Sequence, residues 1–166
     1  MINNTYYSSN KNFKNNNILP TNLRYFYEGD ITEVIEIPDN KNNIDTLTSV
    51  ITYIDIINYK LQKYTKSKSY SGQCISDNKL VVELLISRQL KYACENIQTT
   101  SSIIGLEDLT KVITIAVPNK ISNISIDDIV RRGEFNITPY VENVFFKKIN
   151  SRKVIISISI AINIKF

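Results

Sequence analysis

The last segment of the chain alternates apolar with small or polar residues in a period of two. From Ile156 to Phe166 every even position is apolar, and the odd positions from Ser157 onward are Ser, Ala, Asn or Lys. Side chains of a β-strand alternate between two faces with this period, whereas a helix would spread these apolar side chains around its surface. The pattern predicts a strand over residues 154–166 whose buried face consists of Ile156, Ile158, Ile160, Ile162 and Ile164.

A second long segment, residues 80–94, shows the same alternation. One phase contains the apolar residues Leu80, Val82, Leu84, Ile86, Leu90, Tyr92 and Cys94. Arg88 interrupts this phase, which indicates a bulge, or the point where the strand leaves the core, rather than a ligand-binding arginine. Cys94 lies in the apolar phase, so we expect a buried thiol that packs as a small hydrophobic side chain.

Shorter patterns predict the remaining strands and the fold class. Further strands are expected over residues 23–27, 31–37, 47–57, 59–64, 97–104, 111–117 and 135–146, separated by turn sequences such as Pro38-Asp39-Asn40 and Pro118-Asn119. Residues 127–132 fit one helical turn, and residues 45–50 fit either a short helix or the start of a strand. Short strands at this spacing predict an all-β, antiparallel β-sandwich or open barrel of about eight to nine strands.

The N-terminal segment, residues 1–18, has neither periodicity. It is rich in Asn and contains the aromatic residues Tyr6, Tyr7 and Phe13. Such a composition predicts an extended arm that is disordered by itself. We expect a single β domain over residues 19–166, because this length suits one domain with its own core.

Charge and hydropathy narrow the function classes. The net charge of +4 is spread over the chain without a polybasic tract, which disfavours nucleic-acid binding. The chain lacks a run of about 18 apolar residues, so membrane insertion is not expected. Residues 1–17 lack the apolar stretch of a signal peptide, which predicts synthesis in the cytoplasm.

Histidine is absent from the 166 residues, which removes the usual general base and the common zinc ligand. The acidic residues Asp127, Asp128, Glu107, Asp108 and Glu134 have no spacing that sets two carboxylates opposite each other. We therefore expect no catalytic residue, no metal site and no cofactor, and we expect that the protein is not an enzyme.

Three blocks of the sequence resemble the SPOCS domain, a domain of unknown function in the spore-coat proteins of endospore-forming bacteria. The first block comprises residues 33–38 and 43–47, the second 72–74, 78–83 and 90–93, and the third 138–145 and 149–152. In register, the resemblance covers residues 24–166. It implies a β-rich module of the spore envelope, without a cofactor, that works through protein contacts.

This resemblance leads to an expectation about assembly. We expect a structural protein made in the mother-cell cytoplasm and deposited on the spore surface as coat, exosporium or appendage, with copies of itself and other spore-coat proteins as partners. Assembly would proceed by β-strand addition, in which an extended segment joins a neighbour's sheet. The candidate donor is the arm, with Tyr6, Tyr7, Phe13, Ile18 and Leu19 as pocket-filling residues; a passive tail is the other interpretation.

Two further features stay open at the level of sequence. Cys74 lies in a polar loop, where its thiol is either an intersubunit cross-link or inert. The tyrosines and lysines of residues 53–70 fit a solvated edge strand, or a surface through which a monomeric adaptor would recruit another coat protein or a glycan. This adaptor is the alternative function.

Overall fold

The structure, a computed structural model, describes residues 19–63, 67–68, 74–75, 78–95 and 101–166, and within these it contains eleven strands and one helix. The elements in chain order are β1 (Tyr25–Glu36), β2 (Ile44–Gln62), β3 (Ser67–Lys68), β4 (Cys74–Ile75), β5 (Asn78–Cys94), β6 (Ser101–Gly105), β7 (Leu109–Val117), β8 (Lys120–Ile121), β9 (Ile124–Ser125), α1 (Ile126–Arg132), β10 (Asn136–Lys148) and β11 (Lys153–Lys165).

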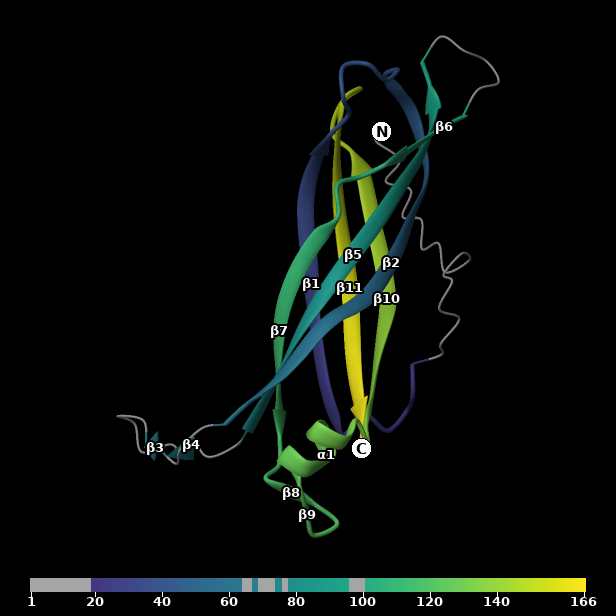
Figure 1. The fold of residues 1–166 in the computed structure, drawn as a ribbon. Coiled ribbons are helices and arrows are strands. Elements are labelled where there is room, and N and C mark those ends of the chain that lie inside the picture. The colour runs from purple at the N-terminus through teal and green to yellow at the C-terminus, as the bar shows by residue number, and fades with distance from the viewer. Residues whose placement is uncertain (1–18, 64–66, 69–73, 76–77, 96–100) are drawn as a thin grey trace.

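The long strands form two antiparallel sheets that pack face to face (Figure 1). The first sheet has the order β1-β11-β10. In the second sheet, β5 pairs with β2 along one edge, and with β7 and then β6 along the other edge. Pairing among the described strands is antiparallel throughout, which confirms the prediction of an all-β, antiparallel sandwich or open barrel.

The core lies between the inward faces of β11 and β5. The five isoleucines predicted to be buried on the last strand, at even positions from 156 to 164, are each at most 2% exposed. The even positions of β5 from Leu80 to Cys94 are likewise buried. Alternation therefore identifies the buried faces of both central strands correctly.

Two pairs of expected strands are single long strands. The strands expected over residues 23–27 and 31–37 are both parts of β1, which runs from residue 25 to 36 without a break. Those expected over 47–57 and 59–64 are both parts of β2, which ends at Gln62 and whose register with β5 shifts at three places. Residues 45–50, which fitted either a short helix or the start of a strand, form part of β2. The expected strand over residues 97–104 is seen as β6 from Ser101 onward, and residues 97–100 lie outside the described residues.

The interpretation of Arg88 as a bulge or an exit from the core is wrong. The register of β5 with β2 runs without a shift through the pair Thr52 and Arg88. The Arg88 side chain stays on the inward face, where only 4% of it is exposed. The inward alternation continues because the Glu33 carboxylate and the Glu107 carbonyl oxygen accept hydrogen bonds from the guanidinium.

The helix α1 has local start and stop signals. The Ser125 hydroxyl accepts a hydrogen bond from the backbone N–H of Asp128, and Gly133 ends the helix at a φ of 69°. The Ser125 hydroxyl also donates a hydrogen bond to the Asp128 carboxylate (2.7 Å), and this second bond is the main reason why the pKa of Asp128 is lowered. In the described part of the chain, no helix has the length and apolar character needed to cross a membrane.

Candidate strand-acceptor groove

The two sheets meet along one side of the sandwich where β1 lies beside β7. Lys111 of β7 connects the two strands: its ammonium donates a hydrogen bond to the Asp30 carbonyl oxygen (3.2 Å) and lies 5.8 Å from the centre of the Tyr27 ring. The missing Cβ of Gly29 leaves the space that the Tyr27 hydroxyl occupies. These contacts close the seam over the first half of β1.

Beyond Lys111 the seam opens into a groove of about 580 Å³, which we call the seam groove. One wall is the second half of β1, and the other is β6 with the corner that leads into β7 (Figure 1). The lining residues are Glu33, Val34, Ile35, Glu36, Pro38, Arg88, Ile104, Gly105, Leu106, Glu107, Asp108 and Leu109.

Both walls of the seam groove are edge strands. Within the described residues, β1 forms a ladder with β11 alone, and β6 and β7 form ladders with β5 alone. The outer edges of β1 and β6 therefore carry backbone N–H and C=O groups that no neighbouring strand pairs. Such groups are a template for an added strand.

The lining residues Val34 and Gly105 are exposed to solvent, so the outer side of the groove is open to an added segment. Val34 on the β1 wall is 59% exposed. A Cβ placed on Gly105 of β6 would meet no atom within 4 Å, so the space beside this residue is open. Half-buried Ile35, Leu106 and Leu109 supply apolar surface beneath these positions.

Arg88 forms part of the floor and joins the two walls. Its guanidinium donates to the Glu33 carboxylate of β1 through Nη1, and to the Glu107 carbonyl oxygen through Nη2 (2.7 Å). The Leu106 N–H donates to the Arg88 carbonyl oxygen (2.9 Å). Arg88 Nε and Thr52 Oγ1 are buried, and neither finds a hydrogen-bond partner among the described residues. The buried arginine thus sets the position of the corner relative to β1.

The rim of the groove is acidic. Its lining contains four carboxylates, from Glu33, Glu36, Glu107 and Asp108, and a single guanidinium, that of Arg88. Glu33 is neutralised by Arg88, and Glu36 lies 3.6 Å from the ammonium of Lys153. Glu107 and Asp108 are exposed and form no ion pair with any described residue. The groove therefore presents negative charge to an incoming segment.

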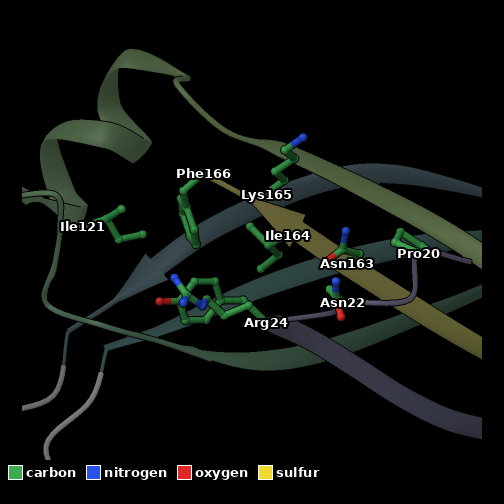
Figure 2. Close-up of a pocket in the computed structure, with 9 residues that line it drawn as sticks. Pro20, Asn22, Arg24, Ile121, Asn163, Ile164, Lys165 and Phe166 are labelled. Atoms are coloured by element: carbon green, nitrogen blue, oxygen red, sulfur yellow. The ribbon is translucent and has the colours of Figure 1, made fainter.

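A second hollow, of about 310 Å³, lies near the other end of β1 (Figure 2). It is lined by Pro20, Asn22, Arg24, Tyr25, Ile121, Asn163, Ile164, Lys165 and Phe166. Figure 2 shows Arg24 extending toward Phe166 and Ile121, whereas Lys165 points away from the hollow. The Tyr25 and Phe166 rings pack edge to face, with centroids 5.4 Å apart. Pro20 in this lining places the start of the described chain at the end of the sandwich remote from the seam groove.

The residues predicted to serve assembly are only partly described. Tyr6, Tyr7, Phe13 and Ile18 lie outside the described residues, and Leu19 is exposed at the first described position. Cys74 pairs with Lys68 in the short β3–β4 ladder, which projects from the sandwich, but its side chain is not among those described (Figure 1). Cys94 is a buried free thiol whose sulfur lies 3.0 Å from the Ser102 hydroxyl, which confirms its predicted burial.

The tyrosines and lysines of β2 do not share one face. Tyr53 lies opposite Ser87 on the outward face, whereas Tyr59 lies opposite the buried Val82 and packs edge to face on Phe135 with centroids 5.0 Å apart. Lys63 forms an ion pair with Asp127 of α1 (3.1 Å). Tyr64, Lys66 and Tyr70 lie outside the described residues. The described part of this segment is therefore not a continuous tyrosine and lysine surface.

Sequence reasoning did not identify the seam groove, although two residues carried a signal. Arg88 interrupts the apolar phase of β5, and Glu33 lies between Ile31 and Ile35 in the inward phase of β1. Two opposite charges that each interrupt a buried face indicate a buried ion pair. A pair between Arg88 and Glu33 predicts that β1 packs over the end of β5. The spacing of Glu107 and Asp108 predicts no catalytic pair, and it gives no sign of the groove that they border.

Comparisons with protein-family models, with curated proteins and with solved structures find no match to this chain.

Proposed function

We propose that this protein is a structural subunit that assembles with copies of itself through β-strand addition. The arm, residues 1–18, of one copy would enter the seam groove of the next and pair with the free edges of β1 and β6. Assembly of this kind requires no catalytic residue, metal or cofactor. Backbone hydrogen bonds would supply affinity, and the alternating side chains of the arm would set the register.

The observation that carries this proposal is the seam groove itself. A sandwich whose two sheets separate along one side leaves two strand edges uncovered, and exposed edges promote association with other chains. The β1 strand itself has Val34 exposed and carries no lysine or proline in the groove lining, where the single proline, Pro38, lies beyond the strand end at Glu36. The groove thus has the backbone and side-chain features of a strand acceptor.

The biological setting that we propose is the bacterial spore envelope. Its support is the resemblance of residues 24–166 to the SPOCS domain of spore-coat proteins. In this proposal the subunit is made in the mother cell and deposited on the spore surface, as coat, exosporium or appendage, where other spore-coat proteins are further partners.

Removal of the donor tests the mechanism. Deletion of residues 1–18 should leave a protein that folds with nearly the same melting temperature, because none of the described core residues is lost. Electron microscopy and analytical ultracentrifugation should show ordered assemblies for the full chain, and soluble monomers or small oligomers for the truncated chain. Phe13→Asp should weaken assembly in the same direction.

Obstruction of the acceptor is the complementary test. Gly105→Tyr adds a large side chain at the exposed outer side of the β6 wall, where a Cβ meets no atom, and it should hinder an incoming strand and reduce assembly without unfolding the domain. Thr114→Tyr, on an exposed position of β7 outside the groove lining, is the matched control and should assemble normally.

If the truncated chain forms the same assemblies as the full chain at the same concentration, strand donation by the arm is excluded. A full chain that stays monomeric would favour the adaptor function instead.

A further inference from the structure

We infer that the seam groove recognises the lysine-bearing part of the arm, residues 11–14, from a second copy, and that opposite charge selects this segment. The inference rests on the proposed function. It adds the part of the arm that binds, the carboxylates that contact it, and the origin of the arm in a second copy. It is carried by the charges of the groove rim and by the reach of the chain.

Charge complementarity is the first argument. The arm contains Lys11 and Lys14 and has no Asp or Glu among its 18 residues. The rim of the groove presents the unpaired carboxylates of Glu107 and Asp108, together with Glu36. Complementary charges across an interface raise the association rate and suppress binding of incorrect partners.

Phe13 lies between the two lysines and supplies the apolar contact. In an extended segment, successive side chains alternate between faces, so Phe13 and Lys14 point to opposite sides. The Phe13 ring suits the apolar lining that Leu106 and Leu109 provide. Lys14 is then directed away from this lining and toward the acidic rim.

The reach of the chain is the second argument, because it excludes the groove of the same copy. Pro20 lines the hollow that contains Asn163, and Asn163 is opposite Phe26 at the start of β1. From Phe26 to Val34, in the middle of the groove wall, the strand rises eight residues, or about 26 Å. The five residues from Lys14 to Leu19 span at most about 18 Å when fully extended. Lys14 therefore falls short of the middle of its own groove, although Lys11, eight residues from Leu19, spans up to about 29 Å. Residues 11–14 as a whole can thus lie in the groove of another copy and not in their own.

Reversal of charge on both sides provides the test, with full-length chains throughout. The rim variant carries Glu107→Lys and Asp108→Lys, and the arm variant carries Lys11→Glu and Lys14→Glu. In each variant alone, arm and groove have the same sign of charge, so the concentration needed for assembly should rise about tenfold or more. Both variants should keep the melting temperature of the parent, since Arg88 bonds the backbone carbonyl of residue 107 and not its side chain.

Mixing the two variants gives the decisive result. The acidic arm of one variant then matches the basic groove of the other, and the remaining arm and groove are both unaltered, so an equimolar mixture should assemble near the parent concentration. Asp55→Lys combined with Glu134→Lys changes the net charge by the same amount as the rim variant, at exposed positions outside the groove, and should assemble normally. Analytical ultracentrifugation and electron microscopy measure both outcomes.

The results separate this inference from the proposed function. If deletion of residues 1–18 abolishes assembly but charge reversal leaves it unchanged, the arm is the donor and recognition by the rim carboxylates is wrong. If each variant is impaired but the mixture stays dissociated, the charges do not meet across the interface and the inference is again overturned. Recovery of assembly in the mixture is the expected result.

Discussion

Arg88 shows how strongly a single residue depends on partners that are distant in sequence. Its neighbours on the inward face of β5 are apolar, yet its guanidinium is buried among them. An isolated buried charge would cost several kcal/mol, and the Glu33 carboxylate and the Glu107 carbonyl offset this cost. These partners come from β1 and from the β6–β7 corner, which are the two walls of the seam groove.

We predict that Arg88→Met destabilises the domain by about 3 kcal/mol. Removal of the guanidinium leaves the Glu33 carboxylate without its counter-charge, and Glu33 is only 28% exposed. Denaturant unfolding below the assembly concentration measures this loss. The double variant Arg88→Met with Glu33→Met should recover most of it, because two apolar side chains replace the pair. A double variant as unstable as Arg88→Met alone would contradict this account.

Glu142 predicts a pH dependence of stability. Burial raises the pKa of this carboxyl group, and the carboxylates of Glu28 and Asp30 raise it further. The Glu142 carboxyl group therefore stays protonated to a higher pH in the folded state than in the unfolded state. As the pH rises from the unfolded pKa through the folded pKa, ionisation of Glu142 lowers the stability of the folded state. Glu142→Gln should raise the melting temperature at pH of about 7 and leave it unchanged at about 3, below the usual carboxyl range. An equal effect at both pH values would show that lost repulsion is not the cause.

At the scale of elements, β11 is the central strand on which the first sheet depends. It pairs with β1 on one edge and with β10 on the other, so its long apolar alternation is covered on both sides. This position removes the aggregation hazard that such a strand would pose at an edge. It also makes the inward face of β11 intolerant of charge.

We predict that Ile160→Asp prevents folding, whereas Asn163→Asp on the same strand is tolerated. Ile160 is fully buried, so its replacement would place an unpaired carboxylate in the core at a cost of several kcal/mol. Asn163 lies on the opposite face, in the hollow that also contains Arg24 and Lys165. Circular dichroism with thermal melting distinguishes the two variants. Equal melting temperatures would mean that the assigned face is wrong.

At the scale of the whole molecule, the first described residues and the seam groove lie at different ends of the sandwich. The described chain begins near the hollow of Figure 2, while the seam groove lies along the second half of β1. Under the proposed function, one patch of a subunit binds a different patch of the next. Such a heterologous contact extends into an open chain unless its rotation happens to close a ring. The proposed mechanism is thus suited to filaments.

The sequence by itself determined the strands and their buried faces. Alternation is a local property of the backbone, so Ile156 to Ile164 and Leu80 to Cys94 identify their inward sides without any knowledge of partners. The short helix α1 was also predictable, since Ser125 and Gly133 cap it from adjacent positions. Strand ends were less predictable. Gly29 and Asp30 are typical turn residues and indicate a gap between two strands, but their pairing with Ile160 and Ser159 of β11 continues β1 through both positions.

Only the tertiary structure decided where the sheets separate and what lies there. Arg88 and Glu33 are 55 residues apart, and each local pattern shows only one charge on an inward face, whereas the packing of β1 over β5 brings the two together. The seam groove likewise depends on the packing of the sheets, which places the edge strands β1 and β6 on its two sides. Local chemistry specifies which side of a strand is buried, whereas the relation between two edges far apart in sequence arises only when the sheets pack.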